Sequence, residues 1–171
     1  RQMTTTATPI EDGKYFLING EKLWCTNGNI AQVIVVMAVT PPKIVNGKEH
    51  KQITAFIVET NTPGFEVVHR CMFMGLHGIQ NGLLRFTNVK VPRENIILGE
   101  GEGLKLALMT LNTGRLTLPA ASTGISKWCL HISRQWSLER KQWGAAIGEH
   151  ESIALKLGYI TSHTFAMEAL N

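Results

Sequence analysis

Hydrophobic and polar residues alternate with a period of two through most of residues 2–91. Because the side chains of a strand point alternately to opposite faces, this pattern predicts β-strands. Asn19-Gly20 favours a hairpin turn after the second run, since both central residues of such a turn need positive φ. The runs richest in β-branched and aromatic residues lie at 4–8, 14–18, 53–58, 65–68, 83–86 and 89–91.

Residues 32–39 form a run that is apolar at almost every position. Such a run predicts a central strand that is covered on both faces. Pro41-Pro42 ends it, and Asn46-Gly47 indicates a hairpin tip or a loose loop. Several short strands at this spacing suggest an antiparallel barrel or sandwich.

The hydrophobic period changes after residues 99–103, where glycines alternate with Glu100 and Glu102. Glycines before a helix can cradle a phosphate, but these glutamates would repel an anion, so we interpret the segment as a hinge or helix start. Apolar residues then follow helical spacing, with a kink or a brief break expected near Pro119. A loop around residues 142–144 precedes a second helix that begins near Glu149.

The fold class predicted from these patterns is α+β. An antiparallel β-barrel or sandwich at residues 1–98 is followed, at residues 99–171, by the long helices of a truncated helical bundle. The first residue is not Met, and the last lies inside a helical pattern, so we expect a fragment of a longer protein.

Composition excludes several classes of function. The chain of 171 residues carries a net charge of +4, and its Lys and Arg residues are scattered, which does not support nucleic-acid binding. No apolar run approaches the roughly 20 residues that span a bilayer, and no signal-peptide pattern is present. Three widely spaced cysteines suit reduced thiols and show no zinc spacing. Reduced thiols suit a cytosol-like compartment.

Trp24 and Thr26 are the first candidate ligand contacts. Strand alternation would place both on one face and Cys25 on the other. The indole could cover a flat heteroaromatic ligand while the hydroxyl bonds its edge, and the alternative is a structural Trp in a β core. Arg115 stands on an apolar helical stripe and needs a partner, which could be a phosphate, a carboxylate or an internal glutamate such as Glu100 or Glu102.

A series of short motifs, in this order and spacing, resembles the middle and C-terminal parts of the acyl-CoA dehydrogenase family. No single motif is specific, but the ordered set is, and it covers essentially the whole chain. The motifs are GEKLWCTNG (20–28), TAFIVE (54–59), TPG (62–64), MGL (74–76), VKVPREN (89–95), GEGEG (99–103), LNTGR (111–115) and RKQWG (140–144).

The resemblance implies an FAD flavoprotein, homotetrameric or homodimeric, that oxidises an acyl-CoA to its trans-2-enoyl form. It also implies electron-transfer flavoprotein as a partner, and a location in the cytoplasm of a bacterium or the mitochondrial matrix of a eukaryote. Trp24 would cover the flavin ring and Thr26 would hydrogen-bond near its N5 atom. The other implied contacts are Arg140, Gln142 and Trp143 for FAD, with Arg140 reaching the pyrophosphate of a neighbouring subunit, and Asn112 and Arg115 for CoA.

The catalytic base has no candidate in this chain. Some members of the family carry a glutamate immediately before the helix arginine, but here that position is Gly114. The resemblance therefore implies a base in a later, C-terminal part, and an inactive fragment. An acyl-CoA oxidase, a flavin-dependent monooxygenase on the same scaffold, and a non-catalytic β-sandwich interaction module remain as alternatives.

Overall fold

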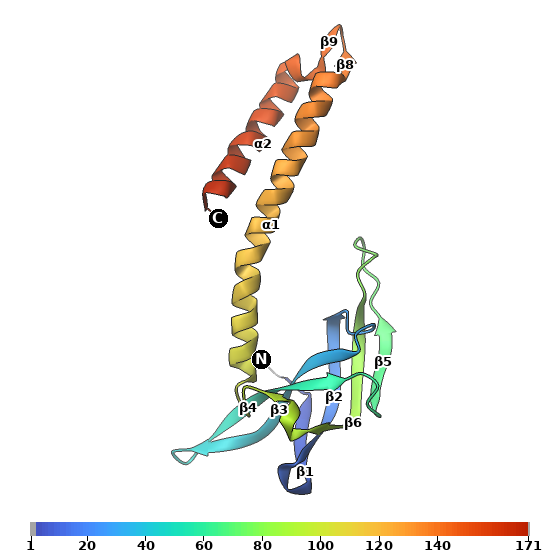
Figure 1. The fold of residues 1–171 in the computed structure, drawn as a ribbon, viewed down its shortest axis with the longest axis vertical. Helices are drawn as coiled ribbons and strands as arrows, with labels where there is room; N and C mark the ends of the chain where they lie inside the picture. The colour runs from blue at the N-terminus through green and yellow to red at the C-terminus, as the bar shows by residue number, and fades with distance from the viewer. Residues whose placement is uncertain (1–2, 171) are drawn as a thin grey trace. The chain divides into compact units, whose positions relative to one another are not determined.

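The computed structural model describes residues 3–170, which form two compact units, one up to Leu108 and one from Met109 (Figure 1). The first unit is a seven-stranded sheet, and the second contains two helices joined by a short hairpin. The α+β class is therefore confirmed.

The sheet of the first unit has the strand order β5-β6-β2-β1-β3-β4-β7. It is mixed rather than fully antiparallel, because β1 pairs with β3 in parallel at Thr6 and Val39. It is also an open sheet, not a closed barrel. Its strands are β1 (Thr6–Ile10), β2 (Tyr15–Thr26), β3 (Val33–Val45), β4 (Lys48–Glu59), β5 (Phe65–Arg70), β6 (Asn81–Pro92) and β7 (Ile96–Ile97).

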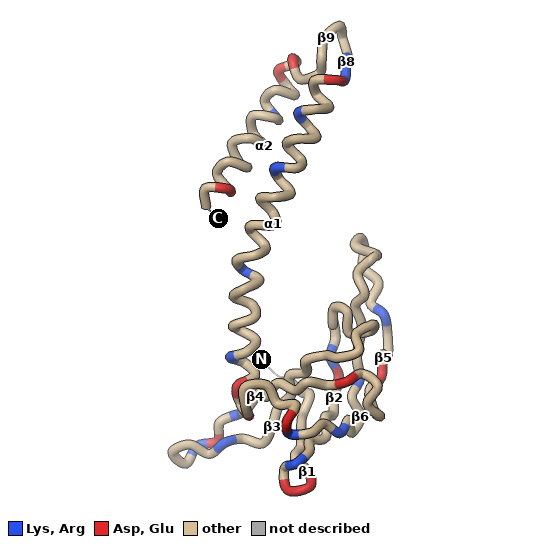
Figure 2. The backbone as a smooth tube through the Cα atoms, viewed as in Figure 1, with Lys and Arg blue, Asp and Glu red and all other residues tan. Residues whose placement is uncertain are grey.

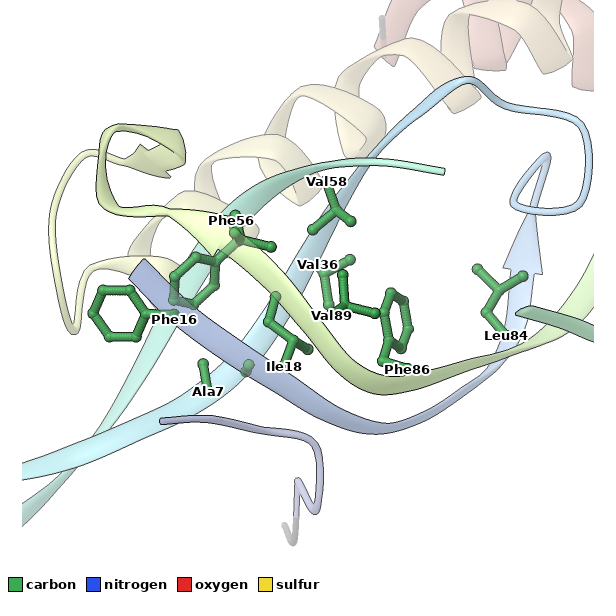
Figure 3. Close-up of a cluster of buried hydrophobic side chains, with 11 residues drawn as sticks. Ala7, Phe16, Ile18, Val36, Phe56, Val58, Leu84, Phe86 and Val89 are labelled. Atoms are coloured by element: carbon green, nitrogen blue, oxygen red, sulfur yellow. The ribbon is translucent and has the colours of Figure 1, made fainter. Parts of the chain in front are cut away.

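The core lies on the inner face of this sheet, which folds back on itself like a sandwich. Phe16 on β2 contacts Phe56 on β4, with ring centroids 5.2 Å apart, although β1 and β3 separate the two strands in the sheet. Figure 3 shows these rings beside Ile18, Val36 and Val89. All five side chains are buried, so burial of apolar surface holds the two halves of the sheet together.

The Asn19-Gly20 dipeptide does not form the expected hairpin turn. It lies inside the continuous strand β2, at a register shift against β6 between Ile18 and Gly20. Gly20 has φ 132°, and a Cβ built there would lie 2.8 Å from the Thr5 Cα. The glycine therefore allows β1 to approach a bulge in β2, which explains why the dipeptide is used in mid-strand.

The other Asn-Gly prediction is confirmed. Asn46 and Gly47 connect β3 to β4, and Val45 opposes Lys48 across the tip. Both turn residues have positive φ, 52° and 73°, as this type of two-residue hairpin requires.

Strand β3 is central in the sheet, but only one of its faces is covered. Val36 and Ala38 are buried, whereas Val33 and Val35 on the other face are each 55% exposed. The prediction that residues 32–39 are covered on both faces is therefore wrong for the chain as described. The apolar residues on the exposed face line a cleft next to the end of β2.

The glycine-rich segment before the long helix is a helix start, as predicted. Helix α1 (Gly103–Glu139) begins where Gly103 packs against β4. A Cβ at Gly103 would lie 2.8 Å from the Ile53 carbonyl oxygen, and the Gly101 N–H donates to Thr54 Oγ1 at 3.0 Å. Glycine thus lets the backbone of the helix start approach the edge of the sheet.

The second unit contains the rest of α1, the hairpin of β8 (Lys141–Gln142) and β9 (Ala145–Ala146), and helix α2 (Glu151–Leu170). Pro119 lies inside α1, which continues through it as a single helix. Gly148 packs against Ser137, and Lys127 forms an ion pair with Glu168, so α2 runs back along α1. No helix among residues 3–170 is long and apolar enough to cross a membrane.

Figure 2 shows Lys and Arg spread along both units rather than gathered in one block.

Candidate functional site

Strand β2 ends in a second irregularity, which sets how its last side chains point. Lys22 opposes Leu84 on β6, and Cys25 opposes Gly82. These partners are two residues apart, whereas Lys22 and Cys25 are three apart, so Leu23 and Trp24 span a bulge. Lys22 and Cys25 therefore share one face of the sheet. Strict alternation, which was the argument for a common face of Trp24 and Thr26, does not hold through this bulge.

Trp24 has left-handed backbone, with φ 62°, and its side chain is 61% exposed. Phe73, from the loop between β5 and β6, stacks on the indole with a centroid distance of 5.8 Å and an interplanar angle of 22°. A bulky residue at positive φ is rare and occurs preferentially at functional sites. The stack holds a large planar ring at the surface, where it could cover a flat ligand. Sequence reasoning did not find Phe73, because no local pattern joins it to Trp24.

Thr26, the last residue of β2, opposes Asn81, the first residue of β6. The Asn81 side-chain amide donates to Thr26 Oγ1 at 3.0 Å. Thr26 is exposed, whereas Asn81 is only 4% exposed. The candidate hydroxyl thus stands at the surface with a buried amide behind it, and Asn81 is a second residue that the sequence did not indicate.

A cleft of about 570 Å³ adjoins this strand end. Thr26, Lys22 and Cys25 line it together with apolar side chains that include Val33 and Val35. Burial lowers the pKa of Lys22, and burial also raises the pKa of Cys25, although the nearby Lys22 ammonium opposes that increase. The volume lies in the range of small-molecule sites, which are mostly apolar with a few polar groups.

Asn112 and Arg115 lie in the second unit, three residues apart on α1, so they share a helix face. Both are exposed. The internal partners considered for Arg115 are engaged elsewhere, because Glu100 pairs with Arg93 at 2.5 Å and Glu102 pairs with Lys105 at 3.3 Å. Within residues 3–170, Arg115 forms no ion pair, which leaves its guanidinium available for an anionic ligand.

Arg140, Gln142 and Trp143 lie together at the hairpin that joins α1 to α2. Trp143 and Gly144 form its turn, with φ 52° and 82°, and the Trp143 side chain is 86% exposed. His150 braces the hairpin. Its Nε2 lies 3.1 Å from the Gln142 carbonyl oxygen, and its ring contacts Trp143 edge-on at 5.5 Å.

The two residue sets of the second unit do not form one pocket. Asn112 and Arg115 lie near the start of its helix, whereas Arg140 follows the helix end at Glu139. At 1.5 Å per residue, the helix between them is about 40 Å long. The part of the chain that the structure describes contains no group of three or more His, Cys, Asp or Glu that could hold a metal ion.

Comparison with known proteins gives consistent matches. The family model for the acyl-CoA dehydrogenase middle domain matches residues 1–89, and the model for the C-terminal domain of the same family matches residues 101–171. Probable acyl-CoA dehydrogenase FadE10 of Mycobacterium tuberculosis is 48% identical over 99% of this chain, which spans 26% of that relative.

Solved structures agree with these sequence matches. Butyryl-CoA dehydrogenase from Megasphaera elsdenii is 37% identical, with a TM-score of 0.82, over 95% of this chain and 41% of that one. An acyl-CoA dehydrogenase from Bacillus anthracis, solved in complex with FAD, is 31% identical, with a TM-score of 0.84, over 97% of this chain and 27% of that one. The chain therefore spans less than half the length of each of these proteins.

Proposed function

This chain belongs to the acyl-CoA dehydrogenase family, and we propose that the full-length protein oxidises acyl-CoA thioesters to trans-2-enoyl-CoA with FAD as cofactor. The observation that carries the proposal is the end of β2, where the exposed Trp24 ring and the exposed Thr26 hydroxyl are two residues apart. The proposed domain boundary is at residues 98 and 99, just before the helix start.

The residues of the first unit fit a flavin. The stacked Trp24 ring would cover the plane of the isoalloxazine, and the Thr26 hydroxyl would donate a hydrogen bond to its edge near N5. The adjoining cleft has apolar side chains, among them Val33 and Val35, that would limit the access of water to this edge. Bound FAD supplies the acceptor for the substrate β-hydride, a group that amino-acid side chains do not provide.

The residues of the second unit fit the charged parts of two nucleotides. Asn112 and Arg115 would bind CoA, and Arg140, with Gln142 and Trp143 beside it, would bind the FAD pyrophosphate. Arginine suits these anions because its guanidinium can donate two hydrogen bonds to one phosphate group. The helix length between the two sets supports an assembly, a homotetramer or homodimer, in which Arg140 serves the FAD of a neighbouring subunit.

Removal of the proton at the substrate α-carbon needs a base. The position immediately before Arg115, where some members of the family carry a glutamate, offers none in this chain. Gly114 has no side chain, and a Cβ built there would meet nothing within 4 Å. We place the base in another part of the full-length protein. A glutamate introduced as Gly114→Glu would have room to stand beside Arg115.

The decisive experiment uses the full-length protein. We expect absorbance of bound FAD, bleached when acyl-CoA is added without oxygen. Thr26→Val should alter the flavin spectrum and slow reduction, whereas Thr87→Val, at an exposed position on β6, should change neither. A colourless protein that takes up no FAD would exclude the proposed function.

The same preparation separates the alternatives. Slow reoxidation by oxygen but fast reoxidation by electron-transfer flavoprotein is expected of a dehydrogenase with that partner. Rapid peroxide formation would identify an oxidase instead. A non-catalytic module would lose partner binding or stability in Trp24→Ala and show no flavin signal to lose.

A further inference from the structure

Thr26 and Asn81 differ sharply in burial although they are hydrogen-bonded partners. Asn81 is 4% exposed, and its backbone carbonyl accepts the Cys71 N–H at 2.8 Å. The Asn81 backbone is thus bonded next to the end of β5, while its side-chain amide reaches Thr26 on β2. The Thr26 side chain is exposed and borders the cleft. Burial restricts the movement of the Asn81 side chain, whereas the exposed Thr26 hydroxyl can meet a ligand.

The direction of the hydrogen bond between them fixes what the hydroxyl can do. A threonine hydroxyl donates one hydrogen bond and accepts up to two. Asn81 Nδ2 donates to Thr26 Oγ1 at 3.0 Å, so this contact uses an acceptor site of the hydroxyl. The Thr26 proton is consequently not directed toward Asn81 and can be donated on the exposed side.

Stability alone does not explain an asparagine at this position. Asn81 Oδ1 is buried, and no described residue donates a hydrogen bond to it. A buried acceptor without a partner costs about 1–3 kcal/mol. An apolar residue of the same shape would avoid that penalty, so the chain keeps a polar group next to Thr26 at a cost in stability.

We propose that Asn81 is a positioning residue that orients the Thr26 hydroxyl as a hydrogen-bond donor toward the bound flavin. This inference rests on the proposed function, because it requires a flavin at Thr26. Asn81 acts through Thr26 and touches neither substrate nor cofactor. It therefore tunes how well the reduced and oxidised forms of the flavin are stabilised.

The test is a comparison of full-length FAD-loaded variants by flavin midpoint potential and by kcat. Asn81→Asp keeps the shape of the side chain, but an ionised carboxylate can only accept hydrogen bonds. The Thr26 hydroxyl should then donate its proton to Asp instead of to the flavin. We expect its potential to shift as in Thr26→Val, and kcat to fall about 2- to 10-fold, the effect of losing one neutral hydrogen bond. Asn81→Leu, which is similar in size but cannot bond, should shift the potential in the same direction.

Two further variants separate positioning from a merely structural role. Because Asn81 acts through Thr26, the double variant Thr26→Val with Asn81→Asp should shift the potential no further than Thr26→Val alone. Asn29→Leu is the matched control. Asn29 donates to Gln80 Oε1 at 3.1 Å and also has a buried oxygen with no partner among the described residues, but it is not bonded to Thr26. It should leave the potential unchanged.

Failure of the proposed role of Thr26 and failure of the proposed role of Asn81 give different outcomes. If Thr26→Val leaves the flavin potential unchanged, the proposed role of Thr26 fails. If Thr26→Val shifts the potential while Asn81→Asp and Asn81→Leu do not, or if the shifts of the double variant add, Asn81 is not a positioning residue and the inference is overturned.

Discussion

Phe73, from the loop between β5 and β6, stacks on Trp24 of β2 with ring planes only 22° apart. Because Trp24 sits in a bulge at positive φ, its own strand does not hold the indole in the usual strand orientation. The ring from the β5–β6 loop supplies that restraint. The planar surface available to a ligand thus depends on two segments that are distant in the sequence.

Removal of this restraint should weaken cofactor binding. Phe73→Leu deletes an aromatic pair, which contributes about 0.5–1.5 kcal/mol beyond its buried area, so we expect the full-length protein to bind FAD about 2- to 10-fold more weakly. Titration of apoprotein with FAD measures the change. Phe73→Tyr keeps the ring and should bind as the parent does. Equal affinities for the Leu and Tyr variants would contradict a role for the stack.

Arg140 should matter for FAD retention through its charge. Arg140→Gln removes one charge-assisted contact with a phosphate, typically about 1.5–3 kcal/mol, which corresponds to roughly 10- to 150-fold weaker binding. The loss should be accompanied by a weaker dependence of affinity on salt. Arg134→Gln, at an exposed arginine in the last turns of α1, six residues before Arg140, is the control. An equal loss in both variants would point to general electrostatics instead.

Gly20 should be intolerant of a side chain. Gly20→Ala combines φ 132° with a Cβ placed 2.8 Å from the Thr5 Cα, and we expect it to lower the free energy of unfolding by about 1–3 kcal/mol. Urea titration followed by fluorescence measures this. Gly158→Ala provides the contrast, since that glycine lies inside α2 with open space around it and alanine favours a helix by up to about 1 kcal/mol. A neutral Gly20→Ala would show that β1 can move away from the bulge.

Cys25 should react as a thiol with a raised pKa. Burial favours the protonated form, so alkylation by iodoacetamide should reach half its maximal rate at a higher pH in the folded protein than in urea. Lys22→Met removes an ammonium that lowers this pKa, and should move the midpoint to still higher pH. Lys48→Met, on the exposed β3–β4 hairpin, should not. Peptide mass spectrometry reports the modified cysteine, and a lower midpoint after Lys22→Met would refute this electrostatic interpretation.

The two Asn-Gly dipeptides show how well a local sequence pattern predicts a hairpin turn in this chain. Asn46-Gly47 forms its hairpin because the strand ends on either side of it, residues 43–45 and 48–50, pair with each other. Asn19-Gly20 carries the same signal, but residues on both sides of it pair with β6, and β1 lies against its glycine. The sequence predicts the turn residues correctly, whereas the neighbouring strands decide whether a turn or a bulge results.

The candidate site was predictable to a similar extent. Trp24, Thr26, Arg140 and Arg115 stand in motifs that are contiguous in the sequence, and the structure places all of them at the surface. Phe73 and Asn81 could not be found this way. Their importance comes from contacts across 49 and 55 residues, and no periodicity or motif encodes such a contact.

The pairing of β2 with β6 also has a consequence for the order of folding. The β3–β4 hairpin closes a loop of a few residues, whereas the contact of Thr26 with Asn81 closes one of 55. The entropic cost of closing a loop increases with the length of the loop. The short hairpin should therefore form first and the long-range pairing later. The strand end proposed to face the flavin is thus completed late, and a chain arrested after its local hairpin would have secondary structure but no ligand-binding edge.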